Sequence, residues 1–222
     1  MDTIVENPRK ITHEQSYEKE NLLRLKRYEE IKRAVCDMSL SEGMKAMGFA
    51  DKAGFRQFKA AFYLACLAHK NQVDKGGMDY ICHPATVALH VRDHHSPSKK
   101  RDRAMTVALL HDVLEDTSVT EDMLRSFAFE EKIIRTVILL THSPGDPYDT
   151  YIEKLTVSRL AMKIKCADMT DNENLNRLKC PATRDIQRSA FYHSRRLAIE
   201  NRLREKKNHK EKRQPETLSA EN

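Results

Sequence analysis

The segment ALLHDVLEDT, residues 108–117, places one histidine and three acids among apolar residues. On a continuous helix, side chains advance by about 100° per residue, so His111 shares a face with Glu115, and Asp112 shares one with Asp116. The preceding MTVALL predicts that this helix is largely buried. Buried carboxylates repel one another and cost several kcal/mol to desolvate. We therefore predict that a cation binds at this segment.

The composition of the whole chain is typical of a helical globular protein. It has 222 residues, of which 40% are hydrophobic and 32% charged, with 6 Gly and no Trp. No apolar stretch approaches the roughly 20 residues that span a bilayer, and the N-terminal MDTIVENPRK lacks the apolar core of a secretion signal. Five cysteines without C-x-x-C spacing argue for reduced thiols in a cytoplasm and against a disulfide framework or a cysteine zinc site.

Apolar residues recur at helical spacing along most of the chain, and no convincing strand pattern or repeat is present. We expect helices from Tyr17 to about Met38 and from Phe55 to about Gln72. Further helices are expected after Pro84, over 101–116, from an N-cap at Thr120, over EEKIIRTVILLTH, and from Tyr148 to about Asn174 with a break near Ser158. The prediction is an all-α fold, a single helical bundle with an N-terminal helical arm and a C-terminal basic helix. The expected divisions are residues 1–54, 55–180, 181–212 and a disordered tail at 213–222.

The net charge of +6 is concentrated at one end of the chain. Between Arg184 and Arg213 there are 11 Lys and Arg against 4 Asp and Glu, so the remainder is about neutral. Leu197, Ile199 and Leu203 are expected to dock this helix on the core. Its cationic face could attract RNA, or it could simply be a solvated surface.

Two other segments offer polar groups against apolar helix faces. His83 lies directly before Pro84 in YICHP, at a predicted helix start. In KCADMTDN, residues 165–172, Asp168 and Asn172 lie one turn apart and share a face. Either segment alone could be an ordinary polar helix surface. Together with residues 108–117 they predict one shared site.

Five motifs carry a family resemblance through their order and spacing. In chain order they are AHKNQ (68–72), KGGMDYICHP (75–84), ALLHDVLEDT (108–117), LLTH (139–142) and IKCADMTDN (164–172). Residues 60–178 resemble the HD-domain hydrolase module of RelA/SpoT-type enzymes and small alarmone hydrolases. The resemblance implies an HD-domain fold and removal of the 3′-pyrophosphate from (p)ppGpp, giving GDP or GTP and pyrophosphate. Nothing after residue 178 resembles the synthetase half of the long enzymes.

The resemblance also implies roles for eight residues. Metal ligation is implied for His83, His111, Asp112 and Asp168. The implied catalytic pair is Glu115 and Asp116, and the implied nucleotide contacts are Lys75 and Asn172. An N/O ligand set without thiolate suits Mn²⁺ or a similar divalent ion more than structural zinc. Glu115 and Asp116 can then orient and deprotonate an attacking water.

Two positions depart from the family pattern. Asp74 stands where the family usually has an arginine that stacks on the purine, and an acid would repel nearby phosphates. Leu175 replaces a family threonine. Phosphohydrolysis is therefore a firmer expectation than guanine specificity. The open alternatives are the same chemistry on (p)ppApp, the phosphate of NADPH or a pyrophosphorylated RNA end, and a non-catalytic nucleotide-binding protein. The sequence predicts no oligomeric state.

Overall fold

The computed structural model describes residues 12–211. Within that range the chain is helical, and its extended pairing is one isolated bridge between Val73 and Asp79. The all-α prediction is thereby confirmed for the described part of the chain. In chain order the elements are α1 (His13–Lys32), the π-helical turn η1 (Arg33–Asp37), α2 (Leu40–Ala46), α3 (Lys52–Ala68), α4 (Cys82–Asp93), α5 (Lys99–Leu110), α6 (Val113–Asp116), α7 (Glu121–Ser126), α8 (Glu131–Leu140), α9 (Tyr148–Leu155), α10 (Arg159–Asn172), the 3₁₀ turn η2 (Leu175–Arg177) and α11 (Thr183–Glu211).

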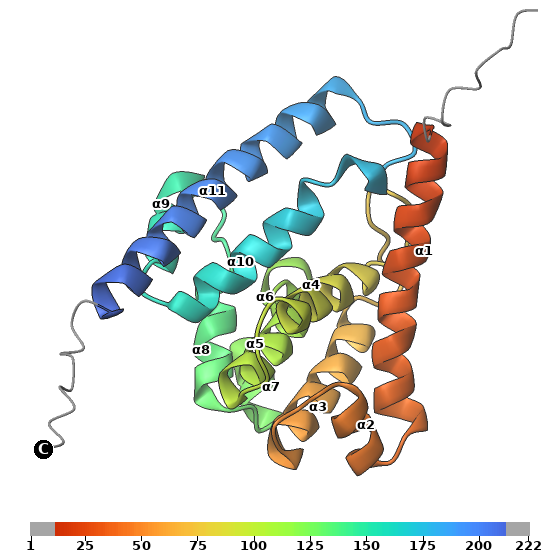
Figure 1. Ribbon diagram of the computed structural model, residues 1–222, viewed down its shortest axis with the longest axis vertical. Coiled ribbons are helices and arrows are strands. Elements are labelled where there is room, and N and C mark those ends of the chain that lie inside the picture. Colours follow the sequence, from red (N-terminus) through yellow and green to blue (C-terminus); the bar gives the residue numbers. More distant parts are fainter. Residues whose placement is uncertain (1–11, 212–222) are drawn as a thin grey trace, which may run out of the picture.

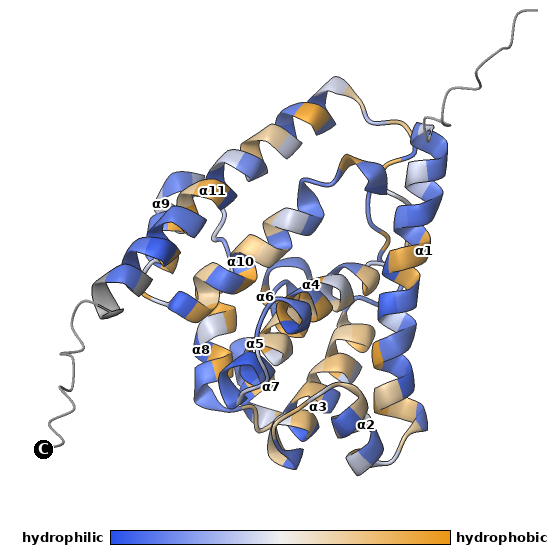
Figure 2. Cartoon of the chain, viewed as in Figure 1, coloured by the Kyte–Doolittle hydropathy of each residue, from blue (hydrophilic) through white to orange (hydrophobic). Residues whose placement is uncertain are grey.

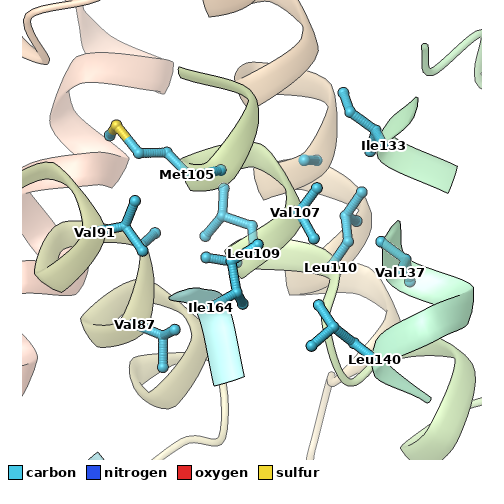
Figure 3. Packing of buried hydrophobic residues seen from close by; sticks show 14 of the residues in the cluster. Val87, Val91, Met105, Val107, Leu109, Leu110, Ile133, Val137, Leu140 and Ile164 are labelled. Carbon is cyan, nitrogen blue, oxygen red and sulfur yellow. The ribbon is translucent and has the colours of Figure 1, made fainter. Parts of the chain in front are cut away.

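Helices α4 and α5 form the centre of the bundle (Figure 1). α5 packs against α3, α4 and α8, and α4 also contacts α1 and α10. All residues from 104 to 110 are buried, because helices surround α5 on several sides. Figure 3 shows Val87 of α4, Leu109 of α5, Val137 of α8 and Ile164 of α10 meeting in one core. This core holds in place the helix ends that carry the predicted ligands.

Two predicted helix starts are confirmed by their caps. The Thr120 hydroxyl accepts a hydrogen bond from the backbone N–H three residues later, where α7 begins. Ser158 does the same at the start of α10 and so separates it from α9. Both side chains satisfy N–H groups that have no partner within the helix.

Two other predicted boundaries are wrong by about one turn. α1 begins at His13 and not at Tyr17, because Thr12 forms a capping box with Gln15. α3 ends at Ala68 and does not continue to residue 72. Asn71 has a φ of 66°, a left-handed conformation that an α-helix does not accommodate.

The central motif does not lie on one continuous helix, which corrects the sequence prediction. α5 ends at Leu110, and His111 and Asp112 form a turn before α6 begins at Val113. Consecutive residues of a helix point about 100° apart. The turn instead brings Nε2 of His111 to 3.1 Å from Oδ2 of Asp112.

The N-terminal segment covers apolar surface of the bundle. α1 packs against α4, and Ile31 and Val35 belong to the same buried cluster as the α5 side chains. The division of the chain at residue 54 stays a prediction.

The C-terminal helix is held by fewer of its predicted apolar residues than expected. Figure 2 shows that α11 is largely hydrophilic, unlike α3. Ile199 is buried and Leu203 packs partly against the core, but Leu197 is 41% exposed. Leu197 was therefore wrongly predicted to dock this helix. The inner face is instead shared by Ile199 and Tyr192, which are seven residues, or about two helical turns, apart.

Several basic residues of α11 are already engaged by acidic groups. Arg195 pairs with Asp149, Arg202 with Glu153, and Arg196 with Glu173. Part of the predicted cationic face therefore holds α11 against α9 and the end of α10.

Three further sequence predictions concern the chain as a whole. No helix in residues 12–211 has the length and apolar character needed to cross a bilayer. All five cysteines are free thiols, as expected. The tail predicted at 213–222 lies outside the described residues.

Candidate metal centre and substrate pocket

Three core helices each bring a predicted metal ligand to one point. His83 lies in the first turn of α4, His111 and Asp112 follow the end of α5, and Asp168 lies in α10. Nε2 of His83 is 3.1 Å from Oδ1 of Asp168 and 3.6 Å from Oδ2 of Asp112. Nε2 of His111 is 3.1 Å from Oδ2 of Asp112 and 3.6 Å from Oδ1 of Asp168. The four side chains therefore surround one small volume.

The Nδ1 atoms of the two histidines fix the orientation of the rings. Nδ1 of His83 donates to Oδ2 of Asp171 at 2.6 Å, and Nδ1 of His111 donates to the carbonyl oxygen of Ala108 at 2.7 Å. The acceptor in each case requires the proton on Nδ1, which leaves the Nε2 lone pair free for a ligand. Metal-binding histidines are commonly oriented in this way.

The residues present fit a divalent metal ion. Nε2 of His111 is buried and has no hydrogen-bond partner among the described residues, because its approach to Asp112 lacks hydrogen-bond geometry. An unsatisfied buried nitrogen is costly unless a ligand occupies it. Atoms at about 2.1 Å from a shared ion are about 3.0 Å apart at right angles and about 3.4 Å apart at tetrahedral angles. Possible ligand atoms of His83, His111 and Asp168 all lie within 4.8 Å of one another. Asp112 is not part of this group of three, but its Oδ2 lies close to Nε2 of both histidines.

Asp168 is kept ionised by its neighbours. Nζ of Lys165 lies 2.7 Å from its Oδ2, and Nδ2 of Asn172 donates to its Oδ1 at 2.5 Å. Burial alone would raise the pKa of Asp168, but the charge of Lys165 and the two histidines lower it well below its usual value. Asn172, predicted to bind nucleotide, therefore also holds a metal-site carboxylate.

The predicted catalytic pair lies on α6 at the wall of the adjoining pocket. Oε2 of Glu115 accepts a hydrogen bond from the backbone N–H of His142 at 2.9 Å. Partial burial raises the pKa of Glu115 in spite of this bond, which brings it toward the range of a general base. The Tyr80 hydroxyl lies 2.7 Å from Oδ2 of Asp112 and 3.0 Å from Oδ2 of Asp116. Tyr80 thus links the predicted metal ligands His83, His111, Asp112 and Asp168, here called the metal group, to the predicted catalytic pair.

Asp74 is held in a buried charge cluster, which corrects the expectation that it repels phosphates. Its side chain is 2% exposed, with Oδ2 at 2.7 Å from Nη1 of Arg24 and 3.1 Å from Nη2 of Arg177. Its Oδ1 accepts the backbone N–H groups of Gly76 and Met78. Burial alone would raise the pKa of Asp74, but the two arginines lower it. The carboxylate is charged, and its charge is compensated on both sides.

The same cluster extends to the metal group. Nη1 of Arg177 lies 2.8 Å from Oδ2 of Asp171, and Nε of Arg24 lies 3.7 Å from its Oδ1. Oδ2 of Asp171 is the atom that accepts from His83. A continuous set of charged contacts therefore joins Arg24 on α1 to a predicted metal ligand on α4.

A pocket of about 280 Å³ opens beside the metal group. Its lining includes Asp112, Asp168, Glu115 and Asp116, together with Lys75, Leu175, Arg188 and Tyr192. Lys75 is exposed and has no ion pair with a described residue; desolvation and the Arg188 charge lower its pKa. The lining combines two predicted metal ligands, Asp112 and Asp168, with the cations Lys75 and Arg188, and such cations favour an anionic ligand.

Several site residues were missed from the sequence. Asp171 carried a usable signal, because it follows Asp168 by three residues and so lies near it on α10. Tyr80 and Lys165 lay inside recognised motifs but had no assigned role. Arg24 carried no signal, since it is fifty residues from its partner Asp74.

No family model matches this chain. A segment of 58 residues is 41% identical to the guanosine-3′,5′-bis(diphosphate) 3′-pyrophosphohydrolase of Haemophilus influenzae. This segment is 26% of the chain and spans only 8% of that protein's length.

A solved structure of a metazoan ortholog of SpoT, described as hydrolyzing ppGpp and playing a role in starvation responses, is similar with a TM-score of 0.54. The two sequences are 24% identical, and the match covers 67% of this chain and 85% of the other. Likeness at this level of identity establishes shared architecture. The chain therefore has the all-α fold of that SpoT ortholog.

Proposed function

We propose that this protein is a divalent-metal-dependent hydrolase that removes the 3′-pyrophosphate from (p)ppGpp or a closely related nucleotide. The observation that carries the proposal is the convergence of His83, His111, Asp112 and Asp168 beside a pocket with an acidic pair and exposed cations. The segment shared with the Haemophilus pyrophosphohydrolase and the fold shared with the SpoT ortholog support the same chemistry. Water adds to the phosphorus atom, the bond to the ribose 3′-oxygen breaks, and GDP or GTP and pyrophosphate leave.

The side chains divide this reaction between them. When bound, a divalent ion supplies Lewis-acid polarisation and lowers the pKa of water, and we propose Mn²⁺ for this N/O ligand set. Glu115, whose pKa is raised, accepts the proton of the attacking water. Asp116 orients that water, and Tyr80 holds the carboxylates of Asp112 and Asp116 in register. Lys75, which lines the same pocket, binds the phosphates.

A second candidate keeps this chemistry and changes the substrate. Arg24 and Arg177 form ion pairs with Asp74, so its negative charge is compensated within the protein. It offers no planar cation to a purine, and Leu175 offers no hydrogen bond. Hydrolysis of (p)ppApp, of the phosphate of NADPH or of a pyrophosphorylated RNA end is therefore the alternative. We also propose a cytoplasmic location, on the ground of the free thiols.

The test is a substrate panel with metal-stripped protein reloaded with Mn²⁺. ppGpp, ppApp, NADPH and a pyrophosphorylated RNA end are incubated separately, and released phosphate and pyrophosphate are quantified. We expect pyrophosphate from ppGpp, and a loss of about 100-fold or more in Asp112→Asn. Asp122→Asn, which removes an exposed carboxylate on α7, is the matched control and retains full activity.

Each other result has a definite meaning. Product from a different substrate at a higher rate selects the second candidate. Tight nucleotide binding with no product from any substrate overturns hydrolysis and leaves a nucleotide-binding protein. Equal activity in Asp112→Asn and wild type would exclude the proposed metal centre.

A further inference from the structure

A second cavity lies at the opposite ends of the helices that carry the metal ligands. Its volume is about 800 Å³. It is bounded by the end of α4 near His95, the start of α5 near Ser98, α8, and the start of α10 near Ser158. The metal group adjoins the other end of α4, α5 and α10. From Ser98 to His111 the chain rises by roughly 20 Å at 1.5 Å per helical residue, so the two sites are separate.

The lining of this cavity carries charge of one sign. Half of its 14 lining residues are lysine or arginine, and none is aspartate or glutamate. Arg101, Arg103 and Arg135 form ion pairs with acids that do not line the cavity. Lys100, Lys132, Arg159 and Lys163 have no ion pair with any described residue. Four cations from three helices therefore face the same space without compensation.

The unpaired cations of α10 act on each other and on His95. Lys163 is only partly exposed, and desolvation together with the Arg159 charge lowers its pKa. Desolvation lowers the pKa of His95, and the Lys163 charge adds to this. The N-termini of α5 and α10, which carry the positive ends of the helix dipoles, lie at the same cavity. Crowded like charges reduce folding stability, and a bound anion would remove this cost.

We infer that the cavity lined by Lys100, Lys132, Arg159 and Lys163 binds an oligophosphate group. A chain of linked phosphates presents several anionic oxygens at once, which suits cations that come from three different helices. The volume is within the range of small-ligand sites. The same group could arrive as inorganic oligophosphate or on a nucleoside. Ala104 and Leu160 add apolar lining that a nucleoside could contact.

The experiment uses the full chain in EDTA and measures binding of inorganic tripolyphosphate by calorimetry and by the shift in Tm. We expect saturable binding at one site per chain. The triple variant Lys132→Gln/Arg159→Gln/Lys163→Gln should weaken it by about ten-fold or more and remove the Tm shift. The matched variant Lys45→Gln/Lys52→Gln/Arg56→Gln removes the same charge from exposed positions of α2 and α3 and should bind as wild type does.

Binding in the hydrolase pocket is distinguished by the variant Lys75→Gln/Arg188→Gln, which should leave tripolyphosphate affinity unchanged. Equal losses in the two triple variants would show a nonspecific charge effect and overturn the proposal. Loss of binding in Lys75→Gln/Arg188→Gln, or no saturable binding in wild type, would overturn it too. GTP or ATP binding more tightly than tripolyphosphate identifies a nucleotide as the source. Equal affinities identify the inorganic chain.

Discussion

At the scale of single residues, the metal group depends on the balance of buried charge around it. Four carboxylates lie together in the core, and three cations are in contact with them. The carboxylates are Asp74, Asp112, Asp168 and Asp171, and the cations are Arg24, Lys165 and Arg177. The carboxylates outnumber the lysine and arginine cations by one. A divalent ion therefore enters a site whose electrostatics already favour it.

Asp171 should control metal affinity through His83. Replacing it by asparagine keeps the size of the side chain but removes the charge that accepts from Nδ1 at 2.6 Å. We expect Asp171→Asn to weaken Mn²⁺ binding by about 10–100-fold, measured by calorimetry. Asp79→Asn, at an exposed neighbouring position, is the control and should bind Mn²⁺ normally. Unchanged affinity in Asp171→Asn would show that the ring orientation does not depend on this carboxylate.

His90, far from the metal group on α4, should make stability fall in acid. Desolvation, followed by the charges of His94 and Arg27, lowers the pKa of His90 to about 4. An unfolded histidine has a pKa near about 6.5, so between these values the unfolded chain binds more protons and stability decreases as pH falls. In His90→Gln this part of the decrease should disappear.

The measurement is the Tm in EDTA at about pH 7.5 and about pH 5, on either side of the unfolded pKa. The Tm of His90→Gln, relative to the Tm of wild type, should be higher at the lower pH than at the higher pH. His193→Gln, at an exposed histidine, serves as the control. An identical pH response in His90→Gln and wild type would contradict the prediction.

At the scale of elements, α1 contributes more than a cover for the core. Arg24 is completely buried, and its guanidinium contacts both Asp74 and Asp171. Its neighbours Leu22, Leu23 and Leu25 are exposed. The helix therefore turns its charged residue inward and several leucines outward, the reverse of the usual amphipathic pattern. Arg24 faces the core because its charge compensates the buried carboxylates of Asp74 and Asp171.

Replacing Arg24 should destabilise the fold because it leaves buried carboxylates short of a partner. We expect Arg24→Met to lower the free energy of unfolding by about 3 kcal/mol, measured by urea denaturation. Lys26→Met, on the exposed side of the same helix, should change it by less than about 0.5 kcal/mol. Equal effects of the two substitutions would mean that α1 contributes only apolar contacts.

The contact between α2 and η1 requires a glycine. A Cβ at Gly43 would lie 2.2 Å from the backbone oxygen of Ala34 and 2.8 Å from the Phe55 ring. Alanine favours helices over glycine by about 0.8–1 kcal/mol, but overpacking costs about 1–3 kcal/mol. We expect Gly43→Ala to lower the Tm, whereas Ser41→Ala in the same helix leaves it nearly unchanged. A higher Tm in Gly43→Ala would show that η1 moves freely away from α2.

At the scale of the whole molecule, α4, α5 and α10 connect two sites of opposite character. One end of the set carries carboxylates and imidazoles, and the other carries uncompensated cations. The helices are packed together throughout by buried apolar residues (Figure 3). Both ends are therefore held by the same core. A ligand or substitution that changes stability at one end should change the stability of the whole bundle.

Metal removal should lower the stability of the entire domain. An ion that binds only the folded state, at 100 times its Kd, adds about 2.7 kcal/mol, which is roughly 5–10 °C in Tm for a chain of this size. We expect Mn²⁺ to raise the Tm of stripped wild-type protein by that order, and Asp168→Asn to show no rise. A rise of the same size in Asp168→Asn would place the stabilising metal elsewhere.

The amino-acid sequence was sufficient for the all-α fold, for most helices, and for the proximity of His83, His111, Asp112 and Asp168. The fold and the helices depend on local periodicity and on capping residues. The four ligands come from segments far apart in the chain, and their proximity was expected from the three polar segments taken together and from the family resemblance. The turn at His111 and Asp112, the inward charge of Arg24 and the cationic cavity were decided only by tertiary packing. Each joins residues that are distant in sequence, or bends a helix that local propensity alone would continue. Coulomb interactions and burial depend on distance in space, which periodicity along one segment does not report.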